Sequence, residues 1–142
     1  MCIAAGEVAN LLGIGRRGIE TNLQLATAFE DGLPVGALDR VCRVVAPDDP
    51  GVRDLLVARA TLSRRRRERR LSSHESEKVG RLARVWALAL DVWQEPDAAR
   101  RFLGEPHPML GGRVPREVAT RTDLGARTVE DILGRLAYGS AA

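Results

Sequence analysis

The stretch from Ser72 to Trp93 constrains the fold of this chain more than any other part of its sequence. It begins with Ser72 and Glu75, whose spacing is that of a capping box, in which each side chain satisfies a free backbone N–H group of the first helical turn. Apolar residues then keep one stripe for about four turns. They are Val79, Leu82, Val85, Trp86, Ala89, Leu90 and Trp93. A helix of this length predicts a fold in which other helices pack around it as a spine.

Shorter helices are predicted on both sides of this spine. Gly32 is placed to end one helix, and Pro34 to begin the next. Asp49 and Pro50 form an N-cap and first-turn pair for a third helix, and Pro96 opens another after the spine. Aromatic residues make up only 4% of the chain, so Leu, Val and Ala must build the core. The predicted fold class is all-α.

The predicted organisation has three parts. Residues 1–20 are expected to be a poorly structured leader with at most a short helix over residues 7–12, residues 21–71 a helix-turn-helix-like part, and residues 72–142 a small helical domain. The cysteines Cys2 and Cys42 are too few for a disulfide framework or a zinc site, which suits a reducing cytoplasm. No apolar stretch approaches the roughly 18 residues of a membrane span. We therefore expect a cytoplasmic protein that does not associate with membranes.

Positive charge is concentrated in one segment. The whole chain carries a formal net charge of +3, but the segment from Arg59 to Arg70 alone contains seven arginines and one glutamate. Like charges crowded in this way repel one another unless a polyanion relieves them, so a localised basic stripe is typical of a phosphate-rich partner. The alternative is a solvated arginine-rich helix without a binding role.

The position of this segment favours DNA as the partner. It follows a short helix and precedes the capped spine, which is the order of a helix-turn-helix with its recognition helix second. Consecutive residues advance by about 100° around a helix, so four arginines in a row cannot all face the bases. We expect first-turn residues near the base edges and the other arginines near phosphates or over the protein surface. The candidate DNA-binding residues are Arg59, Thr61, Ser63, Arg64, Arg65, Arg66 and Arg67.

Patterns that would indicate an enzyme are incomplete. The glycines of GIGRRG, Gly13, Gly15 and Gly18, have dinucleotide-binding spacing, but no βαβ unit is predicted around them. The histidines, His74 and His107, have no ligand or nucleophile at a suitable spacing. We therefore expect no catalytic residues, no bound cofactor and no metal site. A nucleotide-binding enzyme built on the glycine motif is a third class of function, which an NAD titration would test.

The second half of the chain resembles a known family. Residues 70–93, the loop HPMLGGRVP and residues 122–142 are similar to the antitoxin Xre/MbcA/ParS toxin-binding domain family. The resemblance covers residues 72–142 well and residues 32–71 fairly. It rests mainly on small, apolar and aromatic positions at matching spacing. They are Pro106, Leu110, Gly111, Gly112, Pro115, Gly125, Val129, Leu133, Tyr138 and Gly139.

The resemblance implies a type II antitoxin. In such proteins a helix-turn-helix part binds operator DNA and represses the operon, while a C-terminal domain neutralises a toxin. The usual partner is a RES-domain toxin that consumes NAD, so NAD would be the substrate of the toxin and not a ligand of this chain. The end of the antitoxin obstructs the active-site cleft of the toxin. The candidate toxin-binding residues are accordingly Arg135, Tyr138, Gly139, Ser140, Ala141 and Ala142.

The residue types at the C-terminal end suit this role independently. Arg135 and Tyr138 lie one helical turn apart and can share a face, while Gly139 is placed to end the helix. Tyr and Arg are among the side chains found most often at interface hot spots. The alternative interpretation is an ordinary frayed terminus.

The helix-turn-helix departs from the family pattern. From Leu55 to Arg59 the chain has neither a glycine nor a Ser-like cap, and Ala58 cannot cap a helix with its side chain. A helix-turn-helix that only dimerises is therefore an alternative. The expected partners are a RES-domain toxin, operator DNA and a second copy of the chain, in a homodimer and a larger toxin–antitoxin complex. The alternative function is a helix-turn-helix transcriptional regulator without a toxin partner.

Overall fold

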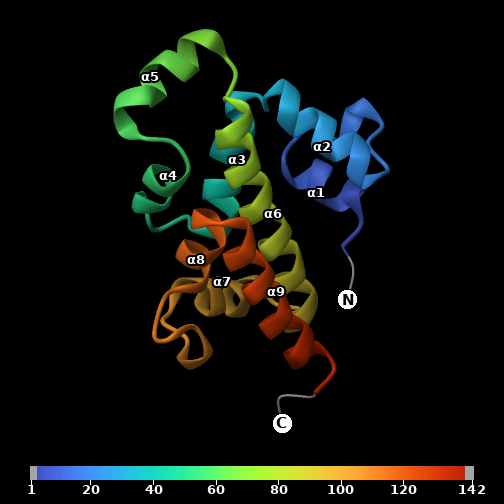
Figure 1. Ribbon diagram of the computed structural model, residues 1–142, viewed down its shortest axis with the longest axis vertical. Coiled ribbons are helices and arrows are strands. Elements are labelled where there is room, and N and C mark those ends of the chain that lie inside the picture. Colours follow the sequence, from blue (N-terminus) through green and yellow to red (C-terminus); the bar gives the residue numbers. More distant parts are fainter. Residues whose placement is uncertain (1–2, 140–142) are drawn as a thin grey trace.

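The computed structural model describes residues 3–139, and every regular element in that range is a helix (Figure 1). The α-helices are α1 (Ala5–Leu11), α2 (Asn22–Asp31), α3 (Val35–Val45), α4 (Gly51–Leu56), α5 (Arg59–Glu68), α6 (Ser73–Trp93), α7 (Pro96–Gly104), α8 (Pro115–Arg121) and α9 (Asp123–Ala137). Short 3-10 helices, η1 (Gly15–Arg17) and η2 (Pro108–Leu110), lie in the connections. The predicted all-α class is confirmed. No helix in the same range has both the length and the hydropathy of a membrane span.

Helix α6 runs through the middle of the molecule as the predicted spine (Figure 1). The structure confirms its capping box: the Glu75 N–H donates to Ser72 Oγ at 3.1 Å, and the Ser72 N–H donates to Glu75 Oε1 at 2.8 Å. The apolar stripe is buried as far as Ala89. At the end of the helix, however, Trp93 is 40% exposed, so the stripe is shorter than predicted.

The helices of both halves of the chain share one hydrophobic core around α6. In Figure 1, α1 and α2 lie on one side of α6, α4 lies on the other, and α7, α8 and α9 surround its lower half. Buried residues from α1 through to α9 belong to a single cluster. The helix-turn-helix-like part and the following helical domain are thus built on a common helix.

The N-terminal segment is structured, although residues 1–20 were expected to form a poorly structured leader. Helix α1 places Ala5 and Val8 in the core, and Leu12 directly after it is also buried. These residues follow the three- and four-residue spacing of an apolar helix face, which the surrounding glycines obscure in the sequence. Gly18 then adopts a left-handed φ of 70°, which turns the chain back toward α2. The expectation is therefore wrong for the described part of this segment.

A buried hydrogen bond joins the connection between α2 and α3 to the spine. The Leu33 N–H donates to Ser76 Oγ at 2.8 Å, and the Ser76 hydroxyl donates to the Ser72 carbonyl oxygen at 2.7 Å. Both Leu33 and Ser76 are fully buried. One turn further along α6, a Cβ atom at Gly80 would lie 2.4 Å from the ring of Phe29. The missing side chain at Gly80 therefore lets α2 lie directly against α6.

Candidate functional sites

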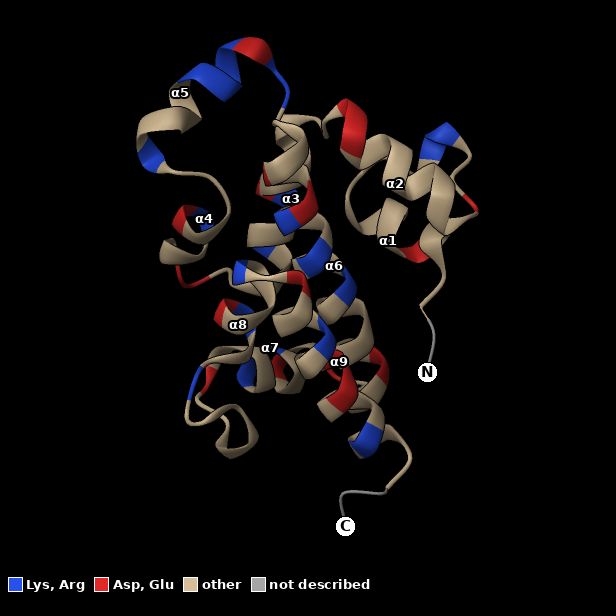
Figure 2. Cartoon of the chain, viewed as in Figure 1, with Lys and Arg blue, Asp and Glu red and all other residues tan. Residues whose placement is uncertain are grey.

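Helix α5 carries the arginine run and stands at the edge of the molecule. It lies at the opposite end of the long axis from the end of α9 (Figure 1). Figure 2 shows that basic residues dominate the second half of α5. No residue of α5 is fully buried, and Leu62 packs against the core with its side chain half-buried. The helix therefore offers most of its surface to a partner.

Helices α4 and α5 have the order and the short connection of a helix-turn-helix. Val52 and Leu56 anchor α4 in the core, and Val57 in the turn is also buried. Ala58 is the N-cap residue of α5 and makes no side-chain capping bond, as the sequence predicted. Helix α5 follows the anchored helix and projects outward, which is the placement of a recognition helix.

The arginines of α5 do not form a uniform surface, because two of them are turned toward the protein. The Arg65 Nε donates to Glu75 Oε1 at 2.7 Å, and the Arg65 side chain is only 16% exposed. The Arg66 guanidinium donates to both carboxylate oxygens of Asp39 on α3, each at 3.1 Å. These contacts tie α5 to α6 and to α3.

Most of the other candidate DNA-binding residues are exposed, and the Arg66 side chain is itself 43% exposed although it pairs with Asp39. Arg64 and Arg67 are exposed, and Arg64 makes a long ion pair of 3.8 Å with Glu68 on the same helix. Arg59 lies 4.0 Å from Asp54 and is almost fully exposed. Of the two candidates with small side chains, Ser63 is exposed and Thr61 is half-buried.

The two carboxylates that hold α5 are stabilised in their ionised form. Hydrogen bonds from Arg66 lower the pKa of Asp39 and outweigh burial, which acts in the opposite direction. Burial acts to raise the pKa of Glu75, but hydrogen bonds from Arg65 and Ser72 outweigh it and leave that pKa below its ordinary value. Both acids therefore stay charged and paired at neutral pH.

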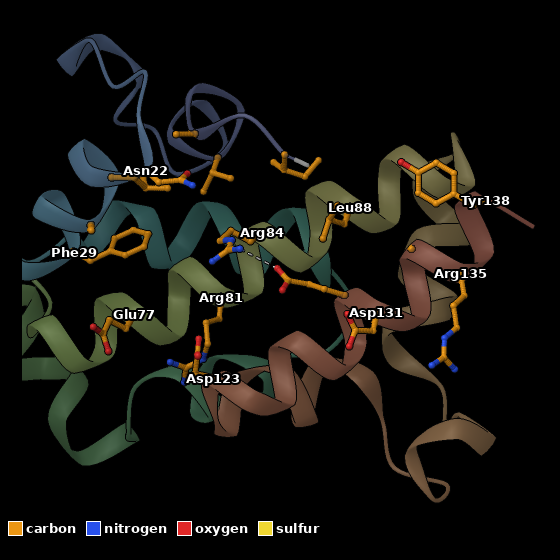
Figure 3. Close-up of a pocket in the computed structure, with 17 residues that line it drawn as sticks. Asn22, Phe29, Glu77, Arg81, Arg84, Leu88, Asp123, Asp131, Arg135 and Tyr138 are labelled. Atoms are coloured by element: carbon orange, nitrogen blue, oxygen red, sulfur yellow. Dashed lines mark ion pairs between the residues drawn. The ribbon is translucent and has the colours of Figure 1, made fainter. Parts of the chain in front are cut away.

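The predicted toxin-binding residues lie at the end of α9. Val129 and Leu133 of this helix are fully buried, and the residues of its last turn lie beyond this buried part. Tyr138 directly follows α9 and is 73% exposed, and Gly139 has a left-handed φ of 69°. Figure 3 shows the Tyr138 ring and the exposed Arg135 side chain extending from α9 in different directions. The remaining predicted residues, Ser140, Ala141 and Ala142, lie outside the described part of the chain.

Tyr138 and Arg135 stand at one end of a groove of about 1010 Å³ (Figure 3). Helices α1 and α2 form one wall of the groove, α9 forms the other, and α6 lies between them. Phe29 and Leu88 contribute apolar surface. An ion pair of 3.2 Å between Arg84 and Glu130 links α6 to α9 within it. The groove thus connects the N-terminal helices with the end of the C-terminal helix.

The glycine motif and His107 have structural explanations. The residues of GIGRRG form a 3-10 turn after α1, and the described residues contain no strand that could build a βαβ unit around them. His107 Nδ1 accepts a hydrogen bond from the Met109 N–H at 3.2 Å, which stabilises the loop before α8. Within residues 3–139, no three His, Cys, Asp or Glu residues are grouped in a way that could hold a metal ion.

Comparison with known proteins matches both halves of the chain. Residues 24–84 match the antitoxin Xre-like helix-turn-helix domain, and residues 88–139 match the antitoxin Xre/MbcA/ParS C-terminal toxin-binding domain. Antitoxin Xre of Pseudomonas putida is 34% identical over 124 residues, which cover 85% of this chain and 76% of that protein. The chain belongs to the antitoxin Xre family. The resemblance inferred from the sequence is thereby confirmed.

In this Xre-family chain the two matched segments meet on α6. The helix-turn-helix match contains both α4 and α5 and extends to Arg84, while the toxin-binding match begins at Leu88 and ends at Gly139. The arginine helix and the exposed Tyr138 therefore fall in different domains of the Xre-type architecture. Sequence reasoning missed Asp39 and the groove, because both arise from segments that are far apart in the chain.

Proposed function

We propose that this Xre-family chain is the antitoxin of a type II toxin–antitoxin pair. It binds a RES-domain toxin, blocks the NAD-consuming active site of that toxin, and represses its own operon by binding operator DNA. The observation that carries the proposal is the presence of a toxin-binding domain over residues 88–139 and a helix-turn-helix domain over residues 24–84 in one chain. The identity of the toxin class rests on the family resemblance of residues 72–142.

We place the toxin-blocking element at Arg135, Tyr138, Gly139 and the residues that follow to Ala142. A large aromatic side chain that is 73% exposed, as at Tyr138, is a suitable anchor for a protein partner. The last turn of α9 can enter a cleft without disturbing the core, because the buried residues of that helix precede it. DNA binding is assigned to α5, whose exposed arginines can contact phosphates.

Co-expression with a candidate RES-domain toxin tests the toxin-binding half. The full-length chain should restore growth and cellular NAD, whereas a chain that ends at Gly134 should not. Circular dichroism of the truncated chain provides the control for folding, and a pull-down reports binding separately from inhibition. Equal rescue by both chains would contradict the assignment of the blocking element. If the full-length chain neither binds nor rescues, the toxin-binding half of the proposal fails, and the alternative of a transcriptional regulator without a toxin partner is favoured.

A reporter driven by the promoter of the operon tests the DNA-binding half. The full-length chain should lower expression from the reporter, and purified protein should bind a duplex that spans the promoter. We also propose that the chain acts as a homodimer, because helix-turn-helix proteins commonly read two symmetric half-sites. Light scattering of the free protein and of the toxin complex measures both assemblies.

A further inference from the structure

We propose that the four consecutive arginines of α5 divide into two pairs with different tasks: Arg64 and Arg67 contact DNA, whereas Arg65 and Arg66 position α5 through Glu75 and Asp39. The inference rests on the proposed function, since it concerns how α5 binds operator DNA.

Helix α5 needs positioning contacts because it has little apolar anchorage. None of its residues is fully buried, and Leu62 is only half-buried. The helix ends at Glu68, and its C-cap residue Arg69 adopts a left-handed φ of 62° that is unusual for a residue with a side chain. An element held by so few apolar contacts depends on its polar contacts for a fixed orientation.

Asp39 is the point where three helices meet. It lies on α3 and accepts two hydrogen bonds at 3.1 Å from Arg66 of α5. It also forms an ion pair of 3.1 Å with Arg53 of α4. The bidentate arrangement fixes both the distance and the plane of the Arg66 guanidinium. Asp39 therefore relates the recognition helix to the two helices that precede it.

Glu75 holds α5 from the other side. It accepts a hydrogen bond of 2.7 Å from Arg65 and, in the capping box, one of 2.8 Å from the Ser72 N–H. The Arg65 and Glu75 side chains are only 16% and 12% exposed, so solvent screens their interaction weakly. The same carboxylate thus caps the spine and fixes the recognition helix to it.

The outward pair lies on a single face of α5. Ala60, Ser63, Arg64 and Arg67 have the spacing of one helix side, and all four are exposed. The small side chains of Ala60 and Ser63 let the helix approach a groove closely. Arg64 and Arg67 on the same face can then reach base edges or phosphates. Arg65 and Arg66 lie off this face, and their hydrogen bonds to Glu75 and Asp39 direct both guanidinium groups toward the protein.

The two possible roles of Asp39 and Glu75 make opposite predictions. If these acids merely neutralise arginines that could bind DNA, the changes Asp39→Asn and Glu75→Gln remove negative charge and tighten DNA binding. If they position α5, the same changes weaken binding although the protein becomes more positive. The sign of the effect therefore separates positioning from neutralisation.

The test measures binding of the full-length protein to a fluorescent duplex of its own promoter at several salt concentrations. We expect Asp39→Asn and Glu75→Gln each to weaken binding about tenfold. The dependence on salt should stay unchanged in both, because Arg64 and Arg67 make the same phosphate contacts once the variant is bound. Arg64→Ala and Arg67→Ala should each weaken binding and reduce the salt slope by about one. Tighter binding with a steeper slope in the Asp39 and Glu75 variants would overturn the inference.

Matched variants control for charge and for folding. Among the described residues, Glu68 forms ion pairs with Arg64 and Arg65 of its own helix and with no other helix, so Glu68→Gln should leave binding unchanged or tighten it. Arg66→Lys keeps the charge but loses the bidentate fork and should weaken binding, whereas Arg67→Lys should change it little. Toxin binding by the same variants reports whether the rest of the chain is folded. If Arg66→Lys binds as tightly as wild type, Arg66 has no positioning role.

Binding by the wild-type protein separates failure of the proposed DNA binding from failure of the proposed division of the arginines. If it does not bind the promoter duplex, the DNA-binding half of the proposed function fails and this inference fails with it. If it binds and the acid-to-amide variants bind more tightly, only the division of the arginines is wrong.

Discussion

Gly125 on α9 lies against the backbone of Val118 on α8, so closely that a Cβ atom at position 125 would stand 2.3 Å from the Val118 carbonyl oxygen. No side-chain rotation can relieve such a contact, because the opposing atom belongs to the backbone. Gly125 is one of the positions that carry the family resemblance. Its role in this structure is to let α9 pack directly on α8, and this packing orients the helix that ends at Tyr138.

Replacing Gly125 by alanine should push α9 away from α8. We expect Gly125→Ala to lower the free energy of unfolding by about 2 kcal/mol, measured by urea unfolding, because overpacking outweighs the better helix propensity of alanine. Gly134→Ala in the same helix is the matched control. Nothing lies within 4 Å of its added Cβ, so the change should stabilise the protein slightly. Equal unfolding free energies of the two variants would show that the close approach of Gly125 to Val118 does not affect stability.

The buried hydroxyl of Ser76 gives a second prediction. Ser76→Ala leaves the buried N–H of Leu33 without its acceptor and should cost about 2 kcal/mol of unfolding free energy. Ser73→Ala, one turn earlier at an exposed position, should change stability by less than about 0.5 kcal/mol. A loss of the same size at both positions would mean that helix propensity, and not the buried bond, sets the cost.

Features that depend on neighbouring residues could be predicted from the sequence. The capping box of Ser72 and Glu75 is contained within one turn, and the buried stripe of α6 follows from its period. The helix-turn-helix order was also evident, as was the placement of a poor cap at Ala58. In each case the interacting residues are only a few positions apart, so their spacing in the sequence is enough to predict the feature.

Contacts between distant segments could not be predicted in this way. The pairing of Arg66 with Asp39 joins residues 27 positions apart, and nothing in the periodicity of either helix selects that partner. The sequence predicted all four consecutive arginines as DNA-binding candidates, some of them over the protein surface, but it could not show that Arg65 and Arg66 are the ones that contact carboxylates of other helices. The order of the segment around Val8 was underestimated for another reason: its apolar spacing is short and its glycines suggested a loose chain with at most a short helix over residues 7–12. The roles of Arg59, Thr61 and Ser63 stay predictions.

Low pH should reduce the free energy of unfolding, in part through protonation of Asp39 and Glu75. Both pKa values lie below their ordinary values of 3.8 and 4.5 in the folded protein, so ionisation of these acids favours the folded state above those values. This contribution is lost as the pH falls through the lowered folded-state pKa values. Between pH 7 and pH 3, wild type should therefore lose more unfolding free energy than the double variant Asp39→Asn with Glu75→Gln. Parallel losses in both proteins would contradict the ionic role of these contacts.

Tyr138 and Leu124 allow a matched test of the toxin-binding end, because both side chains are 73% exposed. Leu124 lies in the first turn of α9, and Tyr138 directly follows its last turn. Tyr138→Ala should weaken toxin binding by about 2 kcal/mol, or roughly thirtyfold in Kd, since an aromatic side chain that becomes buried at an interface hot spot typically contributes that much. Leu124→Ala removes a similarly exposed apolar side chain at the other end of the helix and should leave the Kd unchanged. Titration calorimetry with the purified toxin measures both, and urea unfolding should show unchanged stability. A larger loss at Leu124 than at Tyr138 would move the toxin interface to the start of α9, away from the end of the chain.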